Sequence, residues 1–94
     1  MTGRLRFHEY HRAYLDRVAA DDETAMRERL AIACAAEAER FEQLAEHCYR
    51  QLVIHANIND EIAERHSRAL TVATNKARVM QERAAALREV NRGN

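Results

Sequence analysis

Apolar residues recur every three or four positions along most of the chain, which is the spacing of one face of an α-helix. The longest run has a single polar member and comprises Met26, Leu30, Ala33, Glu37, Phe41, Leu44, Cys48 and Leu52. A second run comprises Ile62, His66, Ala69, Ala73, Ala77, Met80, Ala84 and Leu87. A short first run comprises Phe7, His11, Tyr14 and Val18. The pattern predicts three amphipathic helices, over about residues 4–20, 23–54 and 60–91.

Two polar stretches separate the predicted helices. Asp21 or Asp22 can cap a helix that begins at residue 23, so we expect a turn near residue 21. The second stretch, HANIND, contains good N-cap residues that also compete for backbone hydrogen bonds, namely Asn57, Asn59 and Asp60. It is either a tight turn or a polar interruption of one long helix. The turn is favoured, because a single helix over about residues 23–90 would have to bury its apolar stripe on other chains.

The two strong breakers of regular structure are almost missing, since the chain has no proline and its glycines are Gly3 and Gly93. An all-α fold in one domain, residues 1–94, follows. Alanine at successive positions of the last stripe lets two helices approach closely. We therefore expect a long antiparallel hairpin with coiled-coil-type packing, and a shorter N-terminal helix that folds back on its open end as in a three-helix bundle.

The N-terminal helix is too short to reach the tip of this hairpin. With the turn near residue 57, Cys48 faces His66 and Leu44 faces Leu70, and nothing covers this half. Each large apolar side chain left in water forgoes about 1.5–3 kcal/mol of burial. A second copy packed tip to tip, or another protein, is expected to cover the tip residues Leu44, Cys48, Leu52, Ile62, His66 and Leu70.

The charges sum to zero but are unevenly distributed. Residues 21–52 carry eight acids against four arginines, whereas residues 65–94 carry seven basic residues against two acids. One face of the last helix carries a basic stripe about 27 Å long, formed by Arg65, Arg68, Lys76 and Arg83. Such a stripe can follow a nucleic-acid backbone or an acidic protein surface. The acidic helix beside it, and the lack of helix-turn-helix spacing or an aromatic stacking set, count against nucleic acid.

Candidate chemistry is sparse. Several potential metal ligands fall on inward stripes, namely His11, Glu37, Cys48, His55 and His66. Zinc needs three or four ligands that converge on one point, and the spacing supports no such set, so we expect neither a metal nor another cofactor. A single inward carboxylate leaves no pair for acid–base catalysis, Ser67 is the only serine, and there is no glycine-rich phosphate loop. The sequence predicts a protein that is not an enzyme.

The remaining features suggest a compartment and a role. Cys34 and Cys48 lie about 21 Å apart on one helix and cannot bridge, which suits reduced thiols in a cytoplasmic protein. No apolar run reaches the roughly 20 residues of a membrane helix or resembles a signal peptide. Lys76 is the sole lysine, and the arginine- and alanine-rich composition is typical of GC-rich bacterial or phage genomes. We expect a small adaptor, chaperone or inhibitor subunit that binds itself or another protein, with RNA or DNA binding as the alternative.

Overall fold

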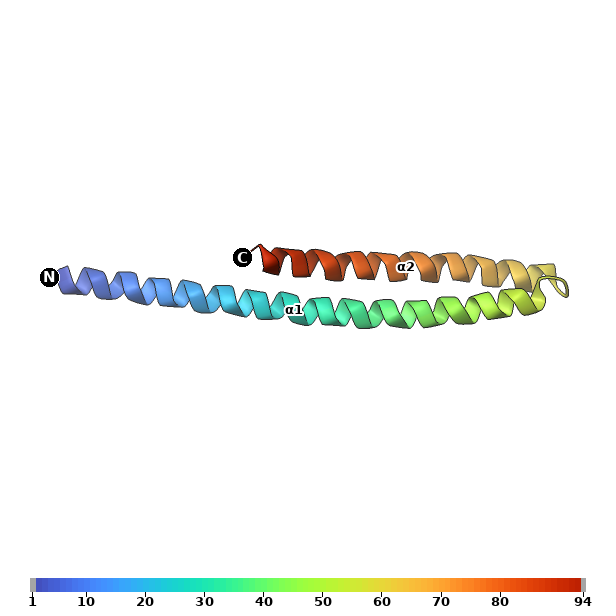
Figure 1. Cartoon of the computed structure of the whole chain (residues 1–94), viewed down its shortest axis with the longest axis horizontal. Coiled ribbons are helices and arrows are strands. Elements are labelled where there is room, and N and C mark those ends of the chain that lie inside the picture. Colours follow the sequence, from blue (N-terminus) through green and yellow to red (C-terminus); the bar gives the residue numbers. More distant parts are fainter. Residues whose placement is uncertain (1, 94) are drawn as a thin grey trace.

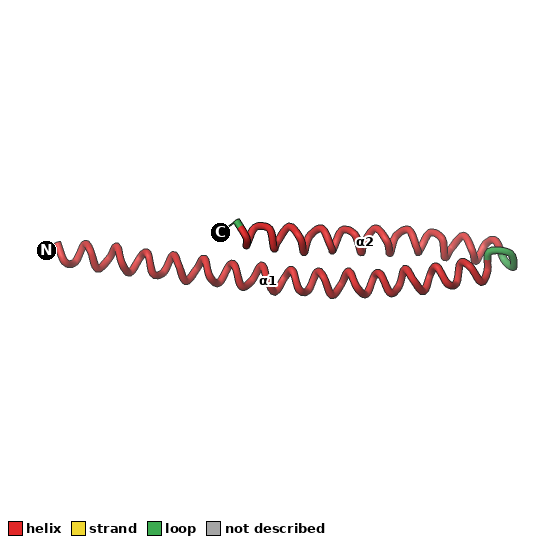
Figure 2. The backbone as a smooth tube through the Cα atoms, viewed as in Figure 1, coloured by secondary structure: helices red, strands yellow, loops and turns green. Residues whose placement is uncertain are grey.

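The computed structural model describes the backbone of residues 2–93 and the side chains of residues 9–93. Within these residues it consists of two helices, α1 (Thr2–His55) and α2 (Asp60–Arg92), and no strand. The helices lie side by side and antiparallel, and a short turn joins them (Figures 1 and 2). The molecule measures 86 × 16 × 15 Å. The predicted all-α fold and the long antiparallel hairpin are confirmed.

The turn between the helices is built around Asn59. Its side chain accepts a hydrogen bond from the backbone N–H of Ile62 at 3.2 Å, and its backbone is extended (φ −149°, ψ 103°), as at a helix N-cap. The backbone N–H groups of Ile58 and Asn59 both donate to the His55 carbonyl oxygen at 3.0 Å. Residues 56–58 therefore prolong the last turn of α1, and the chain reverses at Asn59. The predicted turn is confirmed.

The predicted turn near residue 21 is wrong, because α1 continues without a break through Asp21 and Asp22. An aspartate inside a helix costs less than about 1 kcal/mol relative to alanine, and no glycine or proline adds to this cost. The Thr24 hydroxyl donates to the Ala20 carbonyl at 2.9 Å, which also suits an unbroken helix. No separate helix over residues 4–20 folds back, and the three-helix bundle is not formed.

α1 therefore extends well beyond the end of α2, as Figure 1 shows. The last contacts between the helices join Asn91 to Arg27 and to Thr24. We call residues 2–23 the projecting segment. Its predicted stripe includes Phe7, whose side chain lies outside the described residues.

The seam between the helices is built from small residues. The buried side chains are Ala31, Ala38, Cys48, Ala63, Ala73, Ala77 and Ala84. On α1 the seam differs from the predicted stripe, because the hairpin buries Ala31 and Ala38 where Leu30 and Glu37 were expected. This rotation lets the two backbones approach closely and keeps the Glu37 carboxylate out of an apolar seam, where an unpaired charge would be costly.

The register of the hairpin is fixed at its open end. Arg27 Nε donates to Asn91 Oδ1 at 2.7 Å, and Asn91 Nδ2 donates to the Thr24 carbonyl at 3.0 Å. Counting the same number of residues forward from Arg27 and backward from Asn91 places Phe41 level with Ala77. The predicted register, with the turn near residue 57, differs from this one by about one helical turn, because the chain reverses at Asn59.

Candidate protein interaction surface

The two sides of the hairpin, to left and right of the seam, differ in polarity. On one side the residues that flank the seam recur every seven positions, the repeat of a coiled coil. On α1 they are Leu30, Glu37, Leu44, Gln51 and Ile58, and on α2 they are Ile62, Ala69, Lys76, Arg83 and Val90. We call this the apolar side. Four large apolar side chains on this side are about half exposed or more, namely Leu30, Leu44, Ile58 and Val90. The hairpin therefore leaves these side chains partly in water.

Two adjoining grooves run along the apolar side. The first has a volume of about 420 Å³ and is lined by Glu37, Phe41, Asn75, Lys76, Val79, Met80 and Arg83. The second has a volume of about 380 Å³ and is lined by Leu30, Cys34, Arg83, Ala86, Leu87 and Val90. Arg83 lines both grooves, and we call the two grooves together the apolar depression.

The charges on this depression are not balanced. Glu37 accepts a hydrogen bond from Arg40 at 3.1 Å. The Lys76 ammonium lies 5.5 Å from the centre of the Phe41 ring, a cation–π distance. Neither Lys76 nor Arg83 is among the ion pairs of the described residues. Two cations that form no ion pair among the described residues therefore border the apolar depression, while Glu37 in the same groove is paired with Arg40.

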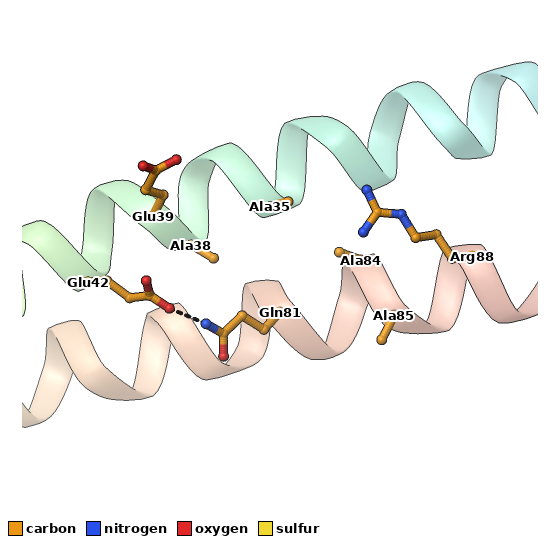
Figure 3. A pocket seen from close by; sticks show the side chains of 8 residues that line it. All are labelled: Ala35, Ala38, Glu39, Glu42, Gln81, Ala84, Ala85 and Arg88. Atoms are coloured by element: carbon orange, nitrogen blue, oxygen red, sulfur yellow. Dashed lines mark hydrogen bonds between the residues drawn. The ribbon is translucent and has the colours of Figure 1, made fainter.

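The opposite side of the hairpin is polar. It carries a groove of about 430 Å³ lined by Ala35, Ala38, Glu39, Glu42, Gln81, Ala84, Ala85 and Arg88. Figure 3 shows the Gln81 amide donating to the Glu42 carboxylate between the helices. Arg88 lies 3.8 Å from Glu28. Polar side chains on this side therefore pair with one another, as on an ordinary hydrated surface.

The six tip residues predicted as an interface divide between the seam and the apolar side. Cys48 is buried in the seam. The half-buried residues are Leu52, His66, Leu70 and, beside the seam, Ile62. Leu44 is about half exposed. Leu44 and Ile62 belong to the apolar side, so the predicted interface overlaps this surface in those two residues. Sequence reasoning missed its open-end members, Leu30 and Val90, although the seven-residue spacing from Leu44 and Ile62 could have revealed them.

The tip brings two imidazoles together. The rings of His55 and His66 are stacked, with centroids 5.8 Å apart and planes inclined by 15°. His55 Nδ1 is buried and has no hydrogen-bond partner among the residues that the structure describes. Cys34 and Cys48 are free thiols. Among the described side chains, no three His, Cys, Asp or Glu residues are grouped so that they could hold a metal ion.

The predicted basic face is partly neutralised within α2. Arg65 pairs with Glu61 at 3.1 Å and Arg68 pairs with Glu64 at 2.9 Å. Each is an i, i+4 pair on a helix surface, of the kind that contributes a few tenths of a kcal/mol. Lys76 and Arg83 are the members of the face that lie on the apolar side.

Comparison of the chain with family models, with curated proteins and with solved structures gives no match. None of the described helices has an apolar stretch long enough to cross a membrane. The surface of the hairpin is therefore the feature of this chain that bears on its function.

Proposed function

We propose that this protein is a stoichiometric protein interaction module, an adaptor, chaperone or inhibitor subunit of a bacterial or phage cytoplasm, that binds another protein along the apolar side of its hairpin. The observation that carries the proposal is the gathering of large exposed side chains on that side, while the fully buried positions of the seam are alanines and Cys48. An apolar depression between two helices fits the apolar face of a third helix.

A small chain gains free energy when a partner covers its exposed apolar side chains. A hairpin of two helices buries a small share of its apolar surface, so a partner that covers Leu30, Leu44 and Val90 supplies burial that the chain lacks. Because these side chains are already half buried, complete coverage contributes about half of the 1.5–3 kcal/mol of full burial for each. The partner is expected to present apolar residues at helical spacing.

The charges on the apolar side indicate which helix fits best. Lys76 and Arg83 form no ion pair among the described residues, so a partner helix with an acidic residue between its apolar positions gains attractive contacts with them. A second copy placed face to face would instead bring the cations of one hairpin toward those of the other. This favours a different protein on the apolar side. Covering of the tip residues by a second copy stays a prediction.

RNA or DNA binding through the basic face is the alternative. It is less supported, because Arg65 and Arg68 already pair with glutamates of α2. Binding to phosphates weakens steeply between about 50 and 200 mM salt, whereas binding along an apolar groove changes little. Titration at the two salt concentrations separates the two functions.

A pair of variants tests the apolar side directly. Leu30→Asp with Leu44→Asp places two charges on it, and Ile32→Asp places a charge at an equally exposed apolar position of α1 that lies outside the flanking lines. The tagged chain and its variants are purified from the native host and the co-purifying proteins are identified by mass spectrometry. We expect one protein at equal stoichiometry with the wild type and with Ile32→Asp, and its loss with the double variant. Equal recovery with all three chains would exclude the apolar side as the interface.

A further inference from the structure

The projecting segment is a helix whose large apolar side chains are exposed wherever the structure describes them, from residue 9 onward. Tyr10 and Tyr14 are 76% and 61% exposed, Leu15 is 52% exposed and Val18 is 38% exposed. Because α1 is continuous, this stripe cannot fold back onto its own hairpin. A helix of about 20 residues without tertiary contacts is marginal in water, so this segment gains most from a partner outside the chain.

The charges along the projecting segment change sign from its start to its end. In the sequence, residues 2–12 carry three arginines and one acid, whereas residues 13–23 carry four acids and one arginine. Two such helices placed in parallel would align acids with acids. Placed antiparallel, each basic half lies beside an acidic half, which favours this arrangement electrostatically.

We propose that the projecting segment is the site at which a second copy of this chain docks, its own projecting segment lying antiparallel on the first. The apolar stripe then sets the register, with His11 level with Tyr14 of the second copy and the two-fold axis between residues 12 and 13. In this register Tyr10 lies close to Arg17 of the second copy, which allows a cation–π contact. The two hairpins point in opposite directions from a central two-helix coil.

The alternative partner for the stripe of the projecting segment is the hairpin of a second copy. Its apolar side carries Lys76 and Arg83, which form no ion pair among the described residues. These cations would attract the acids of residues 13–23 but repel Arg17, whereas the antiparallel arrangement sets the basic half of each projecting segment beside the acidic half of the other.

The first test measures the oligomeric state of the full chain by sedimentation equilibrium from about 1 to 500 μM, the range expected for a short two-helix interface. The wild type is expected to be a monomer at the lowest concentrations and a dimer at the highest. Val18→Asp should raise the dissociation constant by about 100-fold or more, because it buries a charge in the coil. Ala20→Asp, which places the same charge on the opposite face, should alter the dissociation constant by less than about threefold. A wild type that stays monomeric throughout, or equal effects of both variants, overturns the proposal.

The second test measures the arrangement by spin-label distances between two copies. Single cysteines at Ala13 and at Glu23 are labelled in a background with Cys34→Ala and Cys48→Ala. Antiparallel docking predicts a short distance, below about 20 Å, for label 13 and about 30 Å for label 23, from a rise of about 1.5 Å per residue. Short distances at both sites would show a parallel dimer. The reverse pattern would show docking on the second copy's hairpin. Either result overturns the proposal.

Discussion

Ala77 offers a direct test of how tightly the two helices pack. Its side chain is 5% exposed, and the register of the hairpin places it level with Phe41, so a small residue faces a large one. Ala77→Leu would set two large side chains against each other in the seam. Inserting such volume into a packed seam costs about 1–3 kcal/mol, which we expect as the loss in the free energy of unfolding. In a chain of this size that loss lowers Tm by roughly 4–8 °C per kcal/mol.

Ala69→Leu provides the matched control, since Ala69 lies on the same helix but is exposed. Alanine and leucine have similar helix propensities, so the difference between the two variants reports packing alone. Urea unfolding followed by circular dichroism gives both free energies, and Ala69→Leu should change the value by less than about 0.5 kcal/mol. If Ala77→Leu proves as stable as Ala69→Leu, the close approach of α1 and α2 at this level is refuted.

Four further variants address the turn and the charged face. His55→Leu should raise the free energy of unfolding by about 1 kcal/mol, because it removes a buried ring nitrogen that has no hydrogen-bond partner; a lower Tm would show that the stack on His66 matters more. Asn59→Ala should lower it by about 1 kcal/mol through loss of the N-cap, and Asn59→Ser should restore most of it. Replacement of Arg65, Arg68, Lys76 and Arg83 by glutamine should leave urea unfolding nearly unchanged, because exposed ion pairs contribute about 0–1 kcal/mol each. Unaltered binding of that variant to RNA and DNA would exclude the basic face as a nucleic-acid site.

The hairpin could be predicted from the sequence because its signals are local. Asn59 is an N-cap whose side chain bonds the first turn of α2, and such residues rarely suit a helix interior. Of the alanines predicted for the seam of α2, Ala73, Ala77 and Ala84 are buried, whereas Ala69 is exposed. These features depend on neighbours within one turn, which a sequence displays directly.

The N-terminal helix and the seam of α1 could not be predicted in the same way. Asp21 and Asp22 resemble an N-cap. The chain turns at such residues only where the separate helices gain free energy by packing on each other, and that gain depends on the whole molecule. On α1 the large apolar residues and the small ones form adjacent stripes. The choice of Ala31 over Leu30 depends on the close approach of α2, which periodicity alone does not report.

The tight turn at Asn59 also bears on the order in which the hairpin folds. Facing residues near the tip, such as His55 and His66, are close in sequence, whereas Arg27 and Asn91 are 64 residues apart. The entropy lost on closing a loop grows with its length, so nucleation beside the turn is favoured over nucleation at the open end. We therefore expect zipper-like folding, in which each pair formed shortens the loop that the next pair must close. Native-state hydrogen exchange would show this as amide protection that declines from the tip toward Asn91.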